Sequence, residues 1–318
     1  MSQRKALVIP SSGIGDGCIF LSLCCNLAQA GFKVDCIHTN LSCLNDWIDS
    51  YQICSREDFG CCSTAIANQY DVIIINKDSS NFTKTLIETL RKSNCSFYLL
   101  SPSSRRGFLA SENPPIFCRK DLPLLENLSF FYQNIFKITF FEKKTGIQVP
   151  LETTENSKSQ KYIAIHASAS STARQWPLRR FMKVCKRLQS LGYRPVFIFW
   201  DSPQELELAQ RIGSQCEKKV FSQIKPLTSF LNSCMYFIGN DSGLGHLASS
   251  LKIPTLTIFN CPIKKIFWKP NYTVGVGIAP SRWIPNVKWF RIRTYAFFLI
   301  FPWQVMRKFF KLQDLVSK

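Results

Sequence analysis

The feature that most constrains the fold is the regular alternation of short β-branched runs with longer helical patterns along the 318-residue chain. Such alternation is typical of parallel sheets whose strands are joined by crossover helices. In the first half we predict helices after Asp16, Leu41 and Ser80, and strands at 6–9, 34–38, 71–76 and 97–100. In the second half we predict strands at 162–166, 196–200, 236–239 and 255–259, and helices at 178–190, 203–213, 229–233 and 243–251. The sequence therefore predicts an α/β protein with two Rossmann-like domains.

The best candidate for a linker between these domains is the polar stretch 151–161, LETTENSKSQK, which has no hydrophobic periodicity. A chain of this length is about twice the usual domain size. We predict an N-terminal domain at 1–155, a C-terminal domain at 156–279 and a basic, aromatic helical segment at 280–318. Two such domains would face a central ligand cleft with the carboxyl ends of both sheets.

Composition narrows the class of function. Hydrophobic residues make up 46% and charged residues 19% of the chain, which is typical of a folded protein. Lys and Arg outnumber Asp and Glu by 40 to 21, and the net charge of +19 indicates an anionic partner: a nucleic acid, a phosphorylated substrate or an acidic membrane. The chain has no helix-turn-helix, zinc-finger or RNP-like pattern, so we do not expect it to bind nucleic acid.

The 14 cysteines include no C-x-x-C pair, and the three histidines complete no zinc or iron-sulfur spacing, so no metal site is predicted. The amino terminus lacks the apolar region of a signal peptide, so we expect reduced thiols and a cytoplasmic protein. The longest strongly apolar run, at 296–303, is far shorter than the roughly 20 residues of a membrane-spanning helix.

Three loops that follow predicted strands carry unusual residues. The first, Ser11–Asp16, has two glycines that let the backbone approach a ligand closely. Asp16 could serve there as a general base; the alternative is an ordinary helix N-cap, which the spacing by itself favours. The second loop, HASASSTARQWP at 166–177, could cradle an anion with backbone N–H groups and Arg174. Its alternative is a solvated loop in which Trp176 only fills the core.

The third loop, GNDSGLGH at 239–246, leaves a strand, turns on glycine and enters a helix. Free N–H groups in a first helical turn suit a diphosphate, and Asp241, Ser242 and His246 lie within reach of one another. The alternative for His246 is a hydrogen-bonded cap or core residue. The combined pattern is much more specific than a single Gly-x-Gly.

In order and spacing, the three loops resemble those of glycosyltransferase family 9, the bacterial ADP-heptose:lipopolysaccharide heptosyltransferases. The resemblance runs from Ala6 to about Phe259 and is densest at 166–192 and 237–259. It implies a GT-B fold with an acceptor domain, a nucleotide-sugar domain and a final helical segment that crosses back to the first domain. It also implies inverting transfer without a metal or cofactor, and the chain contains no Asp-x-Asp pair.

The resemblance also implies residue roles. Asp16 matches the carboxylate that acts as general base on the acceptor hydroxyl, and Arg174 matches a cation before Trp-Pro that contacts donor phosphate. Glu205 resembles the acidic residue that binds the nucleotide ribose, and His166 is expected to orient its loop. The loop that holds the donor diphosphate is matched by Asp241, Ser242, Gly243 and His246. The chain departs from the family on the acceptor side at Phe20 and Ser22, and at Ala167-Ser168, where the family has Pro-Gly.

The segment 280–318 carries eight Lys or Arg residues against Asp314 alone, interleaved with ten aromatic residues. Basic residues among interfacial aromatics suggest a surface that lies on an anionic leaflet. The alternative is a core-packing helix with a solvated basic face.

From the resemblance and this surface we predict a transferase of heptose from ADP-heptose to the Kdo or heptose of the lipopolysaccharide inner core. Its partners would be the nucleotide-sugar donor, a lipid-linked anionic oligosaccharide acceptor and the inner leaflet of the cytoplasmic membrane. The alternatives are a family-9 relative with another donor or acceptor, such as a core N-acetylglucosamine or protein O-heptosyl transferase, or a catalytically silent membrane scaffold.

Overall fold

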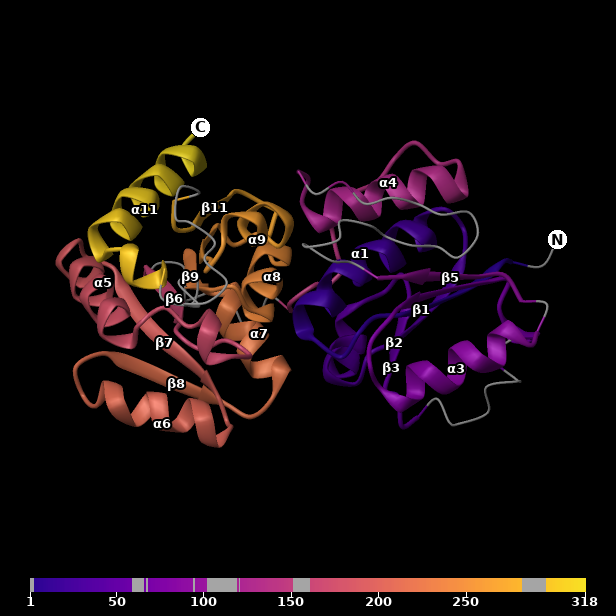
Figure 1. The fold of residues 1–318 in the computed structure, drawn as a ribbon, viewed down its shortest axis with the longest axis horizontal. Helices are drawn as coiled ribbons and strands as arrows, with labels where there is room; N and C mark the ends of the chain where they lie inside the picture. Colours follow the sequence, from indigo (N-terminus) through magenta and orange to yellow (C-terminus); the bar gives the residue numbers. More distant parts are fainter. Residues whose placement is uncertain are drawn as a thin grey trace, which may run out of the picture. The chain divides into compact units, whose positions relative to one another are not determined.

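The computed structural model describes residues 3–58, 66, 68–93, 95–101, 119, 121–150, 161–281 and 296–318. The chain divides into two compact units, Met1–Gln148 (unit 1) and Val149–Lys318 (unit 2). Each unit contains a parallel sheet with helices on both faces, as Figure 1 shows. The division lies close to the predicted boundary at 155, and the predicted linker at 151–161 lies outside the described residues except for Lys161.

Unit 1 is a five-stranded sheet in the order β3-β2-β1-β4-β5. β1 lies in the middle, because Ala6 pairs with Val34 of β2 on one side and with Val72 of β4 on the other. The elements of unit 1 are β1 (Lys5–Ile9), α1 (Ile14–Gln29), β2 (Lys33–Ile37), the 3₁₀ helix η1 (Thr39–Trp47), β3 (Gln52–Cys54), β4 (Val72–Asn76), α3 (Asn81–Arg91), β5 (Phe97–Leu100) and α4 (Leu124–Phe136).

The sequence of unit 1 explains this layering. β4 reads VIIIN and is buried throughout, as expected of a central parallel strand that is covered on both faces. α1 buries eleven of its sixteen residues, and these include Phe20 and Ser22. Both departures from the family pattern in α1 therefore lie in the interior of unit 1.

Unit 2 is a six-stranded sheet in the order β11-β10-β9-β6-β7-β8. β6 and β9 are neighbours in the middle, and His166 pairs with Gly239 at their carboxyl ends. The strands are β6 (Tyr162–His166), β7 (Arg194–Trp200), β8 (Glu217–Phe221), β9 (Tyr236–Asn240), β10 (Thr255–Ile258) and β11 (Gly275–Ile278). The helices are η4 (Thr172–Arg174), α5 (Leu178–Ser190), α6 (Pro203–Ile212), α7 (Ile224–Asn232), α8 (Gly243–Ser250), α9 (Pro262–Phe267), η6 (Ala296–Leu299) and α11 (Pro302–Val316).

The carboxyl-terminal helix α11 belongs to the core of unit 2. It packs on α5, β10 and β11, and its buried side chains Val305, Phe309 and Leu312 join the same apolar cluster as β6 and α5. In Figure 1 it lies beside α5. The expectation that this segment packs on the first domain is therefore wrong for α11, because its apolar stripe is already buried against unit 2. Residues 282–295 lie outside the described part of the chain.

The predicted strands are all present, but β3, β8 and β11 were not predicted, nor were the helices α4 and α9. β3 has only three residues, β8 reads EKKVF and is largely exposed at the sheet edge, and β11 contains two glycines. β3 and β8 carry too few apolar residues to produce a period-two pattern, and the alternation of β11 rests on only two apolar residues. The helix predicted after Leu41 is a 3₁₀ helix. In the described part of the chain, no helix combines the length and the apolar character that crossing a bilayer requires.

Candidate functional site

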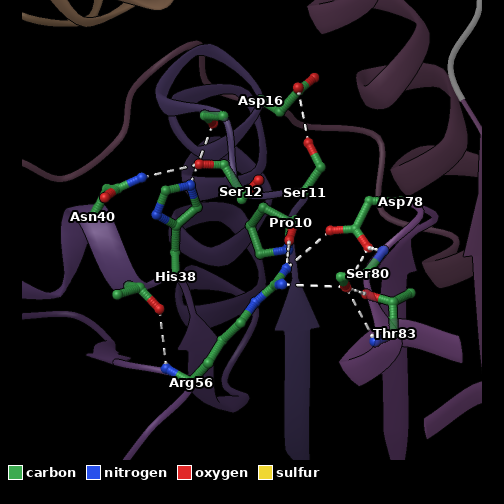
Figure 2. Close-up of polar contacts among 12 residues, drawn as sticks. Pro10, Ser11, Ser12, Asp16, His38, Asn40, Arg56, Asp78, Ser80 and Thr83 are labelled. Atoms are coloured by element: carbon green, nitrogen blue, oxygen red, sulfur yellow. Dashed lines mark hydrogen bonds and ion pairs between the residues drawn. The ribbon is translucent and has the colours of Figure 1, made fainter. Parts of the chain in front are cut away.

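In unit 1, the candidate base Asp16 lies in the first turn of α1, directly after the central strand β1. The N-cap of α1 is Gly13, so the alternative that Asp16 is the helix cap is wrong. The side chain of Asp16 is half-buried, and its Oδ2 accepts a 2.8 Å hydrogen bond from the hydroxyl of Ser11 (Figure 2). A carboxylate held in this way at the carboxyl edge of a parallel sheet is suited to accept a proton from a bound hydroxyl.

The loop before Asp16 is held by His38, which follows β2. His38 Nδ1 accepts a hydrogen bond from the Leu41 N–H, so its Nε2 carries the proton and donates to the Gly13 carbonyl at 3.2 Å. Burial lowers the pKa of His38, although the neighbouring carbonyl acceptors raise it in part. Gly17 makes room for this ring, because a Cβ at Gly17 would lie 2.5 Å from His38 Nε2.

Two more side chains hold the same loop from neighbouring strand ends, as Figure 2 shows. Asn40 donates to the Ser12 carbonyl at 3.1 Å, and Arg56, which follows β3, donates to the Pro10 carbonyl at 3.3 Å. Arg56 also forms a 3.0 Å ion pair with Asp78, which follows β4. Three carbonyls between residues 10 and 13 thus accept hydrogen bonds from side chains outside the loop.

Asp78 anchors this network on the other side of β1. Burial raises the pKa of the Asp78 carboxyl, but hydrogen bonds from Ser80, Thr83 and Arg56 outweigh burial and lower it. The carboxylate accepts from both the N–H and the hydroxyl of Ser80, the N-cap of α3. Our sequence analysis missed this network; the signal for Asp78 was its place just after a predicted strand, but the strand before Arg56 was not predicted.

In unit 2, His166 and Ser242 lie close together between β6 and β9, where the order of the strands in the sheet reverses. His166 Nδ1 lies 3.0 Å from Ser242 Oγ. Gly239 lets the two strand ends approach, because a Cβ there would lie 2.8 Å from the Phe237 ring and 3.0 Å from the His166 carbonyl oxygen. Ligands of open parallel sheets bind at such a change of direction.

The amino terminus of α8 lies at the same place, because α8 begins directly after Ser242. Ser242 is the N-cap, but its hydroxyl contacts His166 and caps no N–H of α8. Gly243 is the first helical residue, so its N–H belongs to the first turn, where an anion is favoured by the helix dipole. Arg174 Nη1 lies 3.9 Å from Asp241 Oδ2, and the Arg174 side chain keeps 35% of its surface exposed. The structure therefore brings a solvent-accessible guanidinium to the predicted diphosphate loop.

Glu205 joins this cluster from the first turn of α6. Its Oε2 accepts a 2.6 Å hydrogen bond from the Trp200 N–H and lies 3.7 Å from His166 Nε2. Burial raises the pKa of Glu205, but the nearby His166 ring and the Trp200 N–H outweigh burial and lower it. Glu205 is therefore an ionised carboxylate at the carboxyl edge of the sheet, although its role toward a ribose stays a prediction.

His246 is buried beneath the first turn of α8, as the core-residue alternative held. Burial lowers its pKa to about 4, partly offset by the Trp268 carbonyl. A neutral ring would give no positive charge to a diphosphate, so among the predicted residues Arg174 and the first-turn N–H groups of α8 are the groups that could attract one. Direct contact between His246 and a donor stays a prediction.

The loop from His166 to Pro177 is anchored in the core by Trp176, as its second alternative expected, and anion binding by the loop stays a prediction. Trp176 is buried and fills the core, and its backbone N–H donates to Asn240 Oδ1 at 2.9 Å. Asn240 Nδ2 in turn donates to the Ala167 carbonyl at 2.7 Å. Asn240, which the sequence analysis did not single out, thereby fixes the loop that carries Arg174. Among the residues that the structure describes, no three His, Cys, Asp or Glu side chains group as metal ligands.

Residues 131–277 match the model of glycosyltransferase family 9 (heptosyltransferase). This range includes every predicted site residue of unit 2 and excludes Asp16. Lipopolysaccharide heptosyltransferase 3 of Escherichia coli K12 is 30% identical over 115 residues, which are 34% of this chain and 33% of that protein. Lipopolysaccharide heptosyltransferase 1 of Campylobacter coli is 30% identical over 44% of this chain and 43% of its own length. The alignments thus span less than half of the length of these curated relatives.

Solved structures resemble the fold over a larger part of the chain. A glycosyl transferase of family 9 from Veillonella parvula has a TM-score of 0.72 at 16% identity, covering all of this chain and 99% of that one. E. coli heptosyltransferase WaaC with ADP has a TM-score of 0.67 at 14% identity, covering 91% and 99%. The two parallel sheets and their helices are those of the GT-B fold.

Proposed function

We propose that the whole chain transfers heptose from ADP-heptose to the lipopolysaccharide inner core, because residues 131–277 match the model of glycosyltransferase family 9 and the fold is that of heptosyltransferases. The acceptor in this proposal is a Kdo or heptose residue. The observation that carries it is the arrangement in unit 2, where Arg174, Asp241 and the uncapped start of α8 meet at the change of direction in the sheet.

Unit 2 is proposed to bind the donor. When the bond from the anomeric carbon to the diphosphate breaks, the departing ADP gains negative charge. The Arg174 guanidinium and the first-turn N–H groups of α8 would stabilise that charge. Glu205 would accept a hydrogen bond from a ribose hydroxyl, and His166 would hold Ser242 in place. Transfer of this kind needs no metal ion to neutralise the leaving group.

Unit 1 is proposed to bind the acceptor. Asp16 would take the proton from the acceptor hydroxyl as its oxygen attacks the anomeric carbon from the side opposite ADP. A single displacement of this kind inverts the anomeric configuration and forms no covalent enzyme intermediate. The hydrogen bond from Ser11 and the held carbonyls of residues 10, 12 and 13 support this role, because they orient the carboxylate before substrate binds.

The test is transfer from ADP-heptose to Kdo2-lipid A and to a heptose-bearing acceptor, in a buffer with chelator and without divalent metal. We expect product from the wild type and at least a 100-fold lower rate from Asp16→Ala, with unchanged ADP affinity. Glu88→Ala is the matched control, since Glu88 is an exposed carboxylate on α3 of the same unit.

The outcomes separate the alternatives. If the protein binds ADP but transfers heptose to neither acceptor, the proposed donor sugar or the proposed acceptor is wrong, and the enzyme uses another sugar or acceptor. No ADP binding at all would overturn the transferase and favour the silent scaffold. An equal rate from Asp16→Ala and the wild type would overturn the role of Asp16 alone.

The lipid-linked acceptor also motivates a proposed location. We infer that the protein is cytoplasmic and associates peripherally with the inner leaflet, where such an acceptor is presented. The net charge of +19 supports attraction to anionic lipids.

A further inference from the structure

We propose that one face of unit 2, formed by η6, the start of α11, α5 and the end of α6, is the surface that docks on an anionic lipid leaflet. This deepens the proposed membrane association and is independent of sugar transfer. Within the described residues, the lipid-docking surface consists of the exposed side chains Phe298, Leu299, Phe301, Trp303, Arg179, Lys183, Lys186 and Arg211.

The apolar part of the surface is a turn that presents large side chains to solvent. Phe298 and Leu299 are each 52% exposed, and Trp303 is 62% exposed. Phe297 and Ile300, which flank Phe298 and Leu299 in the sequence, are buried in the core of unit 2. The turn is therefore anchored on one side and projects its apolar side chains on the other, which a protein that stays in water would not favour.

The projecting rings are held in place by Arg180 of α5. Its Nη1 donates to the carbonyls of Phe298 at 2.9 Å and Ile300 at 2.5 Å, and its guanidinium lies 5.7 Å from the Phe298 ring and 5.1 Å from the Phe301 ring. A second anchor is Trp176 Nε1, which donates to the Ile300 carbonyl at 3.0 Å. Because the turn is ordered before it meets a lipid, insertion costs little conformational entropy.

The basic part of the surface begins on the same helix. Between α5 and α6 lies a groove of about 460 Å³, and none of the residues that line it is acidic. Four cationic side chains surround an apolar base of Leu178 and Met182; they are Arg179, Lys183, Lys186 and Arg211. Cations that flank an apolar floor fit the phosphate of a lipid headgroup and the first carbons beneath it.

Helix α11 also presents both aromatic and cationic side chains to solvent. Trp303, Arg307 and Phe310 are exposed at a spacing of four and three residues, which places them on one side of the helix. Aromatic rings interleaved with cations are typical of helices that lie in a membrane interface. A second copy of the chain is a poorer occupant, because a twofold contact would bring the four cations of the groove toward those of its partner.

The experiment is sedimentation of the full chain with vesicles of phosphatidylcholine alone or with 30% phosphatidylglycerol, at low and high salt. We expect binding to the anionic vesicles only, weakened by salt. The double variant Lys183→Glu, Lys186→Glu should bind the anionic vesicles at least about 30-fold more weakly, since each lysine near the surface contributes a several-fold factor. Phe298→Ser with Trp303→Ser should reduce binding at least tenfold and remove tryptophan protection from an aqueous quencher.

Matched controls lie in unit 1. Lys84→Glu with Lys92→Glu changes two exposed lysines of the α3 region, and Phe140→Ser removes an apolar side chain that is 61% exposed. Both should bind vesicles as the wild type does. Circular dichroism and ADP affinity report whether each variant is folded, and transfer to a water-soluble acceptor should be unchanged in all of them.

Equal binding to neutral and anionic vesicles, no binding by the wild type, or equal losses in the unit 1 controls would each overturn this surface. A dimer in sedimentation velocity that Phe298→Ser with Trp303→Ser dissolves would assign the surface to a second copy and overturn it too. None of these results would bear on the proposed sugar transfer. Loss of transfer in Asp16→Ala would likewise leave the proposed lipid-docking surface unaffected.

Discussion

Ser11 donates its hydroxyl hydrogen to Oδ2 of Asp16 across 2.8 Å, from the loop that leads into the helix carrying that carboxylate. The two residues are five positions apart, so the contact depends on the turn between β1 and α1 rather than on helical spacing. The turn is held by His38, Asn40 and Arg56 through its own carbonyls. The direction of the Asp16 carboxylate is therefore fixed by side chains that follow two other strands of unit 1, β2 and β3.

Removal of this hydroxyl should slow transfer without affecting donor binding. We expect Ser11→Ala to lower kcat about fivefold, the equivalent of one hydrogen bond of ~1 kcal/mol, with an unchanged KM for ADP-heptose. Ser11→Thr keeps a hydroxyl and should retain most of the rate. Steady-state kinetics checks this; a higher KM for the donor with an unchanged kcat would contradict a role through Asp16.

A methyl group at Gly17 should destabilise unit 1, although Gly→Ala within a helix normally stabilises by about 1 kcal/mol. The added Cβ would lie 2.5 Å from His38 Nε2, so the ring must leave its hydrogen bond to Gly13. We expect Gly17→Ala to lower the free energy of unfolding by about 2 kcal/mol in urea titrations. In a His38→Ala background the same change should cost less, although the added Cβ would still lie 2.6 Å from Leu41 Cδ1. Equal costs in both backgrounds would exclude His38 as the source of the destabilisation.

Donor affinity should depend on the guanidinium of Arg174. We expect Arg174→Ala to weaken ADP binding about tenfold in calorimetric titration, and Arg174→Lys to weaken it less, because a charged hydrogen bond contributes ~1.5 kcal/mol. Arg194→Ala serves as control, since Arg194 begins β7 at the opposite edge of the sheet and pairs with Glu217. Affinity lost equally in both variants would mean a general effect of net charge.

The protein should lose stability as the pH falls below 6.5, in part because of His246. Burial lowers its folded pKa to about 4, so between pH 6.5 and 4 the unfolded chain binds a proton that the folded chain does not. The stability is complete above pH 6.5 and declines by up to ~1.4 kcal/mol per pH unit, about 3 kcal/mol over the window. The lowered pKa of His38 acts in the same direction.

Urea unfolding of the wild type and His246→Gln at pH 7.0, 6.0 and 5.0 measures this effect. The variant should have lower stability at pH 7.0 but a shallower decline toward pH 5.0. The carboxyl groups of Asp78 and Glu205 have lowered pKa values and add their own loss only at lower pH. Parallel declines in the two proteins would show that His246 is not the group that titrates.

Loss of the Asn240 side chain should loosen the loop that carries Arg174. Asn240→Ala leaves the buried Trp176 N–H and Ala167 carbonyl without their side-chain partner, which we expect to cost about 2–3 kcal/mol of unfolding free energy. Weaker ADP binding should accompany it because the loop shifts. Asn232→Ala, at the carboxyl end of α7, is a control outside this pair of hydrogen bonds. Unchanged stability of Asn240→Ala would remove Asn240 from the positioning of this loop.

The sequence by itself determined the parts of the protein that local patterns encode. The buried run of β4 and the amphipathic repeat of α5 are visible as hydrophobic periods, so the α/β class and the two units could be predicted. Glycine, acid and hydroxyl residues just after predicted strands indicated the loops of Asp16 and Asp241 for the same reason: carboxyl ends of parallel strands share one edge.

Only the tertiary structure decided which side chains meet at those edges. Arg56 and Asp78 are 22 residues apart and Asn240 and Trp176 are 64 apart, and no local pattern records contacts that depend on strand order. The same holds for α11, whose amphipathic stripe predicts a buried face but not which sheet buries it. Periodicity reports the direction of a side chain relative to its own element, whereas its partners are chosen by how separate elements pack.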